Sequence, residues 1–526
     1  MTGPLHIIGS GAGLPPGGPE AVGRKAYNLA LMADAGLPVP PAFVLPTSWC
    51  RALRSGRARE AEVAEVLDVG MARLEKATGL GFGSPRRPLL VSVRSGGAQS
   101  MPGMLETVLD VGLNVAGVEG LMRLTGNPRL AWDSYRRLVQ GYGEVVQGLP
   151  TTPFDELLAV ALAESEAENE RDLDHRTLRT VALGMAEKFR ALAGRPFPAD
   201  SRTQLLAATM AVFRSWDAPK AVTYRRLNGL AEEAGTAVTV QAMVYGNAGG
   251  ASGAGVAFTR DPATGVRGLY MDFAFNGQGE DVVAGRRATD GGARLSRVLP
   301  GVYGQLETIC RTLESLTGDA QDFEFTVQSG VLWLLQTRRA KRTGWAALRI
   351  AVDLVEEGLL SPAEGRRLLA GIDPASVVRT RFADPSPELA RAQVASVGVA
   401  SGRIALDTAA AERLAASGPV ILVRQATVTE DILGMASAVG ILTASGGRTS
   451  HAAVVARQLG RVCLVACPEL AIDFAQRSCR IGGQEFAEGD WLSLDGNEGT
   501  VHAGQLNAVA ERPERELAAI ATWPDA

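Results

Sequence analysis

The chain has 526 residues, which is too long for one ordinary hydrophobic core and suggests about three domains. Its 53 basic and 57 acidic residues give a formal net charge of −4, so no global positive field for nucleic acid is present. The five cysteines form no CxxC pair, the N-terminus lacks the order of a signal peptide, and no apolar run reaches the roughly 18 residues of a membrane span. These features predict a soluble cytoplasmic protein with reduced thiols and no membrane partner.

The first part of the chain mixes helix and strand patterns. "KAYNLALMADAG" is amphipathic and stops at Gly36, whereas "PLLVSVRS" predicts a buried strand. Residues 115–235 have a helical pattern, and their acidic run at 163–174 is interpreted as a solvated helix face or loop. From Thr236 the pattern alternates, which predicts strands joined by hairpins and closed by "FEFTVQSGVLWLLQTR" at 323–338.

The second part of the chain predicts a linker and a separate module. Two helices follow within 341–394, and strands then alternate with helices over 395–504. Residues 505–526 are interpreted as a tail with one helix and a loose end. The predicted fold class is a multidomain protein of α/β and α+β type.

Three glycine-rich stretches raise the question of phosphate binding. "IIGSGAG" at 7–13 lacks the strand-turn-helix context of a dinucleotide site, because two prolines follow it. "GPEAVGRKA" at 18–26 fails as a Walker loop, yet Lys25 opens a helix where a cation and free amides can hold phosphate. The stretch at 246–265 is either a lid over a triphosphate or a flexible hairpin.

Charged residues on the closing strands form a candidate metal and phosphate site. Asp322 and Glu324 are two residues apart, so a strand places both on one face, and Gln336 and Arg338 share a face of the next strand. Carboxylate oxygens suit Mg²⁺, and the guanidinium suits phosphate. The alternative is a solvated face with surface salt bridges.

Two further residues have open roles. Arg94 ends a predicted buried strand, where it could bind phosphate or pair with Glu106. His451 follows a glycine pair and begins an alanine-rich helix, so it is a packed helix start, a metal ligand or a catalyst. The metal-ligand role is weak, since no second histidine or cysteine lies three to five residues further on.

The motifs, taken together, resemble the pyruvate phosphate dikinase family, with phosphoenolpyruvate synthases as more distant relatives. "VSVRSGGAQSMPGMLETVLDVGLN", "SGAGVAFTRDPATG", "QDFEFTV", "LLQTRRAKRT" and "GGRTSHAAVVAR" occur in the family's order. The resemblance implies an ATP-grasp nucleotide-binding domain at 1–340 with a helical insert at 115–235. It further implies a linker at 341–394, a swivelling β/β/α phosphohistidine domain at 395–504 and a tail at 505–526.

The resemblance also implies a reaction and its residues. ATP would pyrophosphorylate His451 with release of AMP, and inorganic phosphate would remove the outer phosphoryl group as pyrophosphate. Thr449 matches a threonine at which some members are regulated, Glu324 and Gln336 would bind Mg²⁺, and the loop at 246–255 would be the lid. The implied nucleotide and phosphate contacts are Lys25, Arg94, Gln241, Gly253, Gly255, Asp322, Glu324, Gln336 and Arg338.

Two departures from the family pattern affect these expectations. The usual "GGKG" start is "VGRKAYN" here, and the sequence stops at Ala526, where members continue into a (β/α)8 barrel that binds pyruvate or phosphoenolpyruvate. We therefore expect the final acceptor to be pyruvate on a separate barrel subunit, or another small acceptor. A non-catalytic nucleotide-binding or regulatory homologue is the alternative from a different class, and a homo-oligomer stays open.

Overall fold

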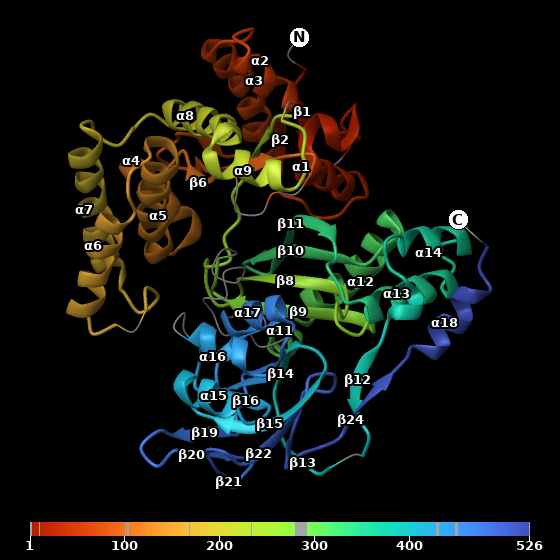
Figure 1. Ribbon diagram of the computed structural model, residues 1–526. Helices are drawn as coiled ribbons and strands as arrows, with labels where there is room; N and C mark the ends of the chain where they lie inside the picture. Colours follow the sequence, from red (N-terminus) through yellow and green to blue (C-terminus); the bar gives the residue numbers. More distant parts are fainter. Residues whose placement is uncertain are drawn as a thin grey trace. The chain divides into compact units, whose positions relative to one another are not determined.

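A computed structural model describes residues 3–9, 11–99, 101, 105–167, 169–232, 234–278, 292–384, 386–427, 431–447 and 451–524 (Figure 1). The chain divides into two compact units, Met1–Ser252 with Thr326–Thr337, and Gly253–Phe325 with Arg338–Ala526. Both units mix helices and strands, so the predicted α/β character is confirmed. Within the described ranges, no helix has the length and apolar character needed to cross a membrane.

The first unit is built on an antiparallel sheet of order β1-β2-β7-β5-β6. Its strands β2 and β7 are buried along their whole length, which explains their dense apolar sequences "AFVL" and "AVTVQA". The strands of this unit are β1 (His6–Ile8), β2 (Ala42–Leu45), β3 (Gly81–Phe82), β4 (Pro88–Leu89), β5 (Val91–Gly96), β6 (Thr107–Val111) and β7 (Ala237–Ala242).

Helices fill the rest of the first unit, as the sequence predicts for 115–235. Asn127, Asp174 and Asp200 begin three of them by accepting a hydrogen bond from the backbone N–H three residues further on. The helices are α1 (Gly18–Asp34), α2 (Thr47–Arg54), α3 (Glu60–Thr78), α4 (Val115–Thr125), α5 (Pro128–Gln147), α6 (Thr152–Glu164), α7 (His175–Ala193), α8 (Ser201–Arg214) and α9 (Pro219–Leu227).

The acidic run at 163–174 is more than a solvated segment. Glu170 accepts hydrogen bonds from Arg136 at 2.7 Å and from Arg137 at 3.3 Å, and both arginines also bind the buried Asp133. Glu170, within the run, therefore joins a charge network on α5, in which the buried Arg136 is paired with carboxylates.

A four-stranded sheet of order β11-β10-β8-β9 includes strands of the second unit. The strands β8 and β9 pair antiparallel, as the alternating sequence predicts. Its strands and the helices around them are β8 (Gly253–Arg260), β9 (Arg267–Phe275), α11 (Ala293–Val298), α12 (Pro300–Thr317), β10 (Gln321–Gln328), β11 (Val331–Arg339), α13 (Gly344–Glu356) and α14 (Pro362–Leu368).

The remainder of the second unit contains an eight-stranded sheet of order β13-β23-β22-β15-β16-β17-β18-β14. Four central strands run parallel, namely β15 to β18, and antiparallel strands flank them. The bounds are β13 (Glu388–Arg391), β14 (Gln393–Ser396), β15 (Val399–Ala405), α15 (Thr408–Ala415), β16 (Val420–Arg424), α16 (Ile432–Ser437), β17 (Gly440–Thr443), α17 (His451–Leu459), β18 (Val462–Val465), β22 (Trp491–Asp495) and β23 (Thr500–Ala503).

Smaller elements complete the second unit. A three-stranded antiparallel sheet joins β19 (Leu470–Asp473), β20 (Ser478–Ile481) and β21 (Gln484–Ala487). The tail is not loose over its described part: β24 (Ala508–Glu511) pairs with β12 (Arg379–Phe382), and α18 (Glu514–Ala521) packs on α13 (Figure 1). Trp523 is buried there, and its carbonyl accepts a hydrogen bond from Arg366 at 2.7 Å.

Candidate functional site

The turn before Lys25 is fixed by a close backbone contact in the first unit. Helix α1 is interrupted at Gly23, whose φ of 77° and ψ of 150° are not helical, so Lys25 lies in the first turn after this break. A Cβ on Gly23 would lie 2.3 Å from the carbonyl oxygen of Gly96. The Arg24 N–H donates to the Gly97 carbonyl at 3.0 Å. The sequence therefore needs glycine at position 23 because another backbone occupies the space of a side chain.

The same unit brings Lys25, Arg94 and Gln336 onto neighbouring elements. Asn28, on α1, donates its amide to the Thr337 carbonyl at 2.7 Å, and Arg94, on β5, donates Nη1 to the Leu335 carbonyl at 3.5 Å. Both contacts flank the buried Gln336 on β11. The elements that carry these three residues are therefore neighbours in this unit, and a phosphate site shared by their side chains stays a prediction.

The structure gives partners for Glu106 and for Gln241. Glu106, the proposed structural partner of Arg94, makes an ion pair with Lys220 at 2.6 Å. Gln241 is buried on β7 and donates its amide to the Pro40 carbonyl at 3.2 Å. This hydrogen bond gives Gln241 a structural role, and its contact with nucleotide stays a prediction.

The glycine-rich stretch is anchored at several points. In the first unit, the Ser329 N–H donates to Ser252 Oγ at 2.9 Å, and the Gly330 N–H donates to the Ala251 carbonyl at 2.8 Å. In the second unit, a Cβ on Gly253 would lie 2.2 Å from the Phe273 ring, and one on Gly255 would lie 2.5 Å from the Phe325 ring. Packing against aromatic rings is therefore a sufficient reason for both glycines.

Asp322 and Arg338 form an ion pair in the second unit. Arg338 Nε donates to Asp322 Oδ2 at 2.8 Å; the carboxylate is buried and the guanidinium is half-exposed. Burial raises the pKa of Asp322; the charge of Arg338 opposes this rise, and that of Glu324 adds to it. The alternative of a solvated face with surface salt bridges therefore holds only for Arg338, because its acidic partner lies inside the protein.

The donor atoms suit a hard cation, although the described residues form no ready-made metal centre. Throughout the described ranges, no group of three or more His, Cys, Asp or Glu side chains is placed to hold a metal ion. Glu324, which is part-exposed on β10, and the amide oxygen of Gln336 are oxygen donors of the kind that Mg²⁺ takes. The residue types thus fit a metal that is held partly by phosphate oxygens.

His451 is the first residue of α17, the helix that follows the strand β17 in the sequence. The strands β15 to β18 are parallel, so their carboxyl ends share one edge of the sheet, and β17, the strand that precedes α17, ends at that edge. Ligands of parallel sheets bind outside this edge. Thr449 lies outside the described residues.

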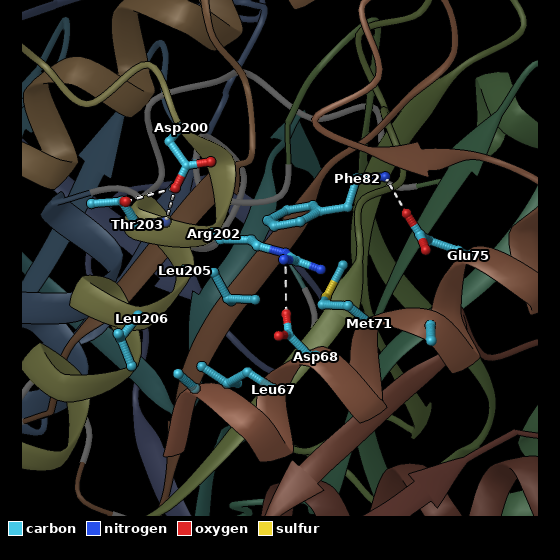
Figure 2. Close-up of a pocket in the computed structure, with 12 residues that line it drawn as sticks. Leu67, Asp68, Met71, Glu75, Phe82, Asp200, Arg202, Thr203, Leu205 and Leu206 are labelled. Atoms are coloured by element: carbon cyan, nitrogen blue, oxygen red, sulfur yellow. Dashed lines mark hydrogen bonds and ion pairs between the residues drawn. The ribbon is translucent and has the colours of Figure 1, made fainter. Parts of the chain in front are cut away.

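A cavity of about 270 Å³ in the first unit has no overlap with the predicted site (Figure 2). It lies between α3 and α8, where Leu67, Met71 and Phe82 form its apolar part and Arg202 pairs with Asp68 at 3.2 Å. None of its lining residues belongs to the predicted nucleotide site.

Two matches with known domains decide the family. Residues 19–294 match the domain described as "Pyruvate phosphate dikinase, AMP/ATP-binding domain", and residues 416–499 match "PEP-utilising enzyme, mobile domain". The chain belongs to the pyruvate phosphate dikinase family. His451 falls within the second match, whereas Asp322, Glu324, Gln336 and Arg338 lie between the two.

Curated relatives agree with this assignment over nearly the whole chain. Pyruvate, phosphate dikinase of Clostridium symbiosum is 41% identical over 515 residues, and that of Rhizobium meliloti (strain 1021) is 42% identical over 526 residues. Pyruvate, phosphate dikinase 2 of Zea mays is 42% identical over 516 residues. Each match covers 96% of this chain and 58% of the relative, so the chain spans little more than half their length.

Proposed function

We propose that the chain is an ATP-dependent phosphotransferase of the pyruvate phosphate dikinase type, with His451 as the phosphoryl carrier. The observation that carries the proposal is the pair of matches in one chain, a nucleotide-binding domain and a mobile domain that contains His451. The nucleotide-binding region, 1–340, would be an ATP-grasp domain with its insert at 115–235. The region 395–504 would be a swivelling β/β/α domain joined by the linker 341–394.

The proposed loading step has two transfers. An imidazole nitrogen of His451 attacks the β-phosphorus of ATP, and the bond from that phosphorus to the α,β-bridging oxygen breaks, so AMP leaves. Inorganic phosphate then attacks the outer phosphorus, pyrophosphate leaves, and one phosphoryl group stays on nitrogen. Neutral imidazole is a competent nucleophile near its reference pKa of about 6.5, and the resulting phosphoramidate is reactive enough to pass the group on.

The chain's own residues would bind and orient the nucleotide. Lys25, Arg94 and Arg338 supply cations for the phosphate oxygens, and Asp322 orients Arg338 through its ion pair. Mg²⁺, held by Glu324 and Gln336, would neutralise charge on the phosphates when bound. Gln241, Gly253 and Gly255 would complete the nucleotide contacts, and the loop 246–255 would cover them.

The final phosphoryl acceptor has two candidates. The relatives are named as pyruvate, phosphate dikinases, so pyruvate is the first candidate, reached through a barrel in the same or a separate polypeptide. A different small acceptor is the second candidate. Regulation at Thr449 would act on the residue two positions before the carrier.

Labelling from ATP tests the loading step. Incubation with Mg²⁺, inorganic phosphate and ATP labelled in the β-phosphate should place acid-labile label on the protein and release AMP. The His451→Asn variant should bind ATP as the wild type does and take up no label. A wild-type chain that binds ATP without labelling or AMP release would instead support the nucleotide-binding homologue.

A further inference from the structure

The cavity between α3 and α8 of the first unit is lined along α3 by two neighbouring rows of side chains (Figure 2). The residues of each row repeat every four positions and so share one side of the helix: Ala64, Asp68 and Ala72 in one row, and Leu67, Met71 and Glu75 in the next. Because the two alanines line the cavity with single methyl groups, larger side chains at these positions would fill part of its space.

The buried side chains of the cavity are apolar. Leu67, Met71 and Leu205 are only 3%, 5% and 2% exposed, and the part-buried Phe82 and Leu206 extend this surface. Water finds few hydrogen-bond partners against such a surface, whereas an apolar ligand removes it from water with a gain in free energy. This part of the cavity therefore suits the apolar body of a small molecule.

The charged side chains of the cavity favour a cation over an anion. Asp68, Glu75 and Asp200 are acidic, and Arg202 is the one basic residue among the lining residues, all of which the structure describes. Arg202 pairs with Asp68 at 3.2 Å, as Figure 2 shows. The charge that remains on the lining is therefore negative, which attracts a cation and opposes an anion.

Glu75 is the acid that is placed to bind this cation. Its Oε1 accepts a hydrogen bond from the Phe82 N–H at 2.8 Å, which ties the carboxylate to a residue whose ring lines the cavity (Figure 2). Within the described part of the chain, no donor binds its Oε2. Asp200 is already engaged, because it accepts hydrogen bonds from the Thr203 N–H at 2.8 Å and from the Thr203 hydroxyl at 2.6 Å.

We propose that this cavity binds a small organic amine, with its apolar body against the buried side chains and its ammonium group on Glu75. The ammonium group forms a charge-assisted hydrogen bond with the second oxygen of the carboxylate, and an aromatic or branched body fits the apolar lining. The pair of Arg202 with Asp68 is exposed, so its opening to admit the ligand costs little. The site goes beyond the proposed phosphotransfer, because it shares no residue with the predicted nucleotide site.

Three probes of similar size test the charge preference: 2-phenylethylamine, 2-phenylethanol and 3-phenylpropionate. In titration calorimetry on the full chain, the amine should bind with a Kd of about 1 mM or lower, and the alcohol should bind at least about fivefold more weakly. The acid should show no binding. An amine that does not bind at about 10 mM, or an alcohol or acid that binds as tightly as the amine, overturns the inference.

Variants of α3 locate the binding. Glu75→Gln keeps an acceptor for the Phe82 N–H and removes the charge, so it should weaken binding of the amine at least about fivefold and leave binding of the alcohol unchanged. Glu65→Gln is the matched control, since Glu65 is exposed on the same helix and does not line the cavity. This control should bind the amine as the wild type does.

Ala64→Leu fills part of the cavity and should abolish binding of both the amine and the alcohol, while its melting temperature shows that it is folded. Amine binding that survives in folded Ala64→Leu, or that falls equally in Glu75→Gln and Glu65→Gln, overturns the inference. Labelling from ATP measures the proposed function separately, so the failure of one proposal is distinguishable from the failure of the other.

Discussion

Replacement of Gly23 by alanine tests whether the break in α1 is held by backbone contact. The backbone at Gly23 lies in a region of φ and ψ that is nearly restricted to glycine, which costs an alanine about 1–3 kcal/mol. The new Cβ would also lie 2.3 Å from the Gly96 carbonyl oxygen, so one backbone must move, at a cost of about 1–3 kcal/mol. We expect the free energy of unfolding to fall by about 3 kcal/mol.

Gly36→Ala is the control for this prediction. Gly36 has a φ of 75°, close to the 77° of Gly23, but a Cβ there would meet nothing within 4 Å. It should lose only about 1 kcal/mol, from the left-handed conformation. A loss of 1 kcal/mol lowers the melting temperature by about 2–4 °C, so calorimetry should show a melting temperature lower by roughly 6–12 °C for Gly23→Ala and by roughly 2–4 °C for Gly36→Ala.

Nucleotide binding gives the second measurement of the same pair. A displaced turn moves Lys25 relative to Gly96, so Gly23→Ala should bind a fluorescent ATP analogue more weakly, whereas Gly36→Ala should bind it as the wild type does. Equal melting temperatures for the two variants, together with unchanged binding in both, would refute the steric reasoning.

Two charge networks give further predictions. Burial would raise the pKa of Asp133, but Arg137 and Arg136 outweigh it and lower the pKa to about 2 from 3.8. The lowered pKa contributes about 2 kcal/mol of stability above pH 4, which is lost as the pH falls towards 2. Asp133→Asn should therefore be less stable than the wild type at pH 7 in urea titrations, by a margin that narrows in acid; a constant margin would contradict this. Arg260 is fully buried and binds both Glu314 oxygens at 2.9 Å, so Arg260→Gln should lower the free energy of unfolding by about 3–5 kcal/mol in the same assay. Arg515 is half-exposed, so Arg515→Gln should lower it by less than about 1 kcal/mol. Equal losses in the two variants would show that burial does not decide the outcome.

Local sequence patterns were sufficient for most elements. The alternation from Thr236 predicted strands that the structure confirms as β7, β8 and β9, and the alanine-rich run after His451 predicted α17. These predictions succeeded because a strand or helix with one buried face repeats its apolar residues at a fixed period. In the tail the predicted helix is present as α18, but the predicted loose end is wrong for Trp523. Nothing local in "AIATWPDA" shows that this side chain packs in the core formed with α13 and α14.

The residues of the candidate site divide in the same way. Sequence motifs alone selected Lys25, Arg94, Arg338 and His451, because cations and a histidine in family order indicate phosphoryl transfer. Only the tertiary structure supplied the partners of Arg94 and Arg338, since a hydrogen bond joins atoms that the sequence keeps far apart.

Gly23 illustrates that division best. The sequence shows that a glycine lies two residues before Lys25, and a glycine at that place indicates a turn. Only the folded structure shows why no other residue fits at position 23: the Gly96 carbonyl oxygen would lie 2.3 Å from a Cβ there. The same holds for Gly255 against the ring of Phe325, because excluded volume depends on what lies opposite, and a sequence does not contain that information.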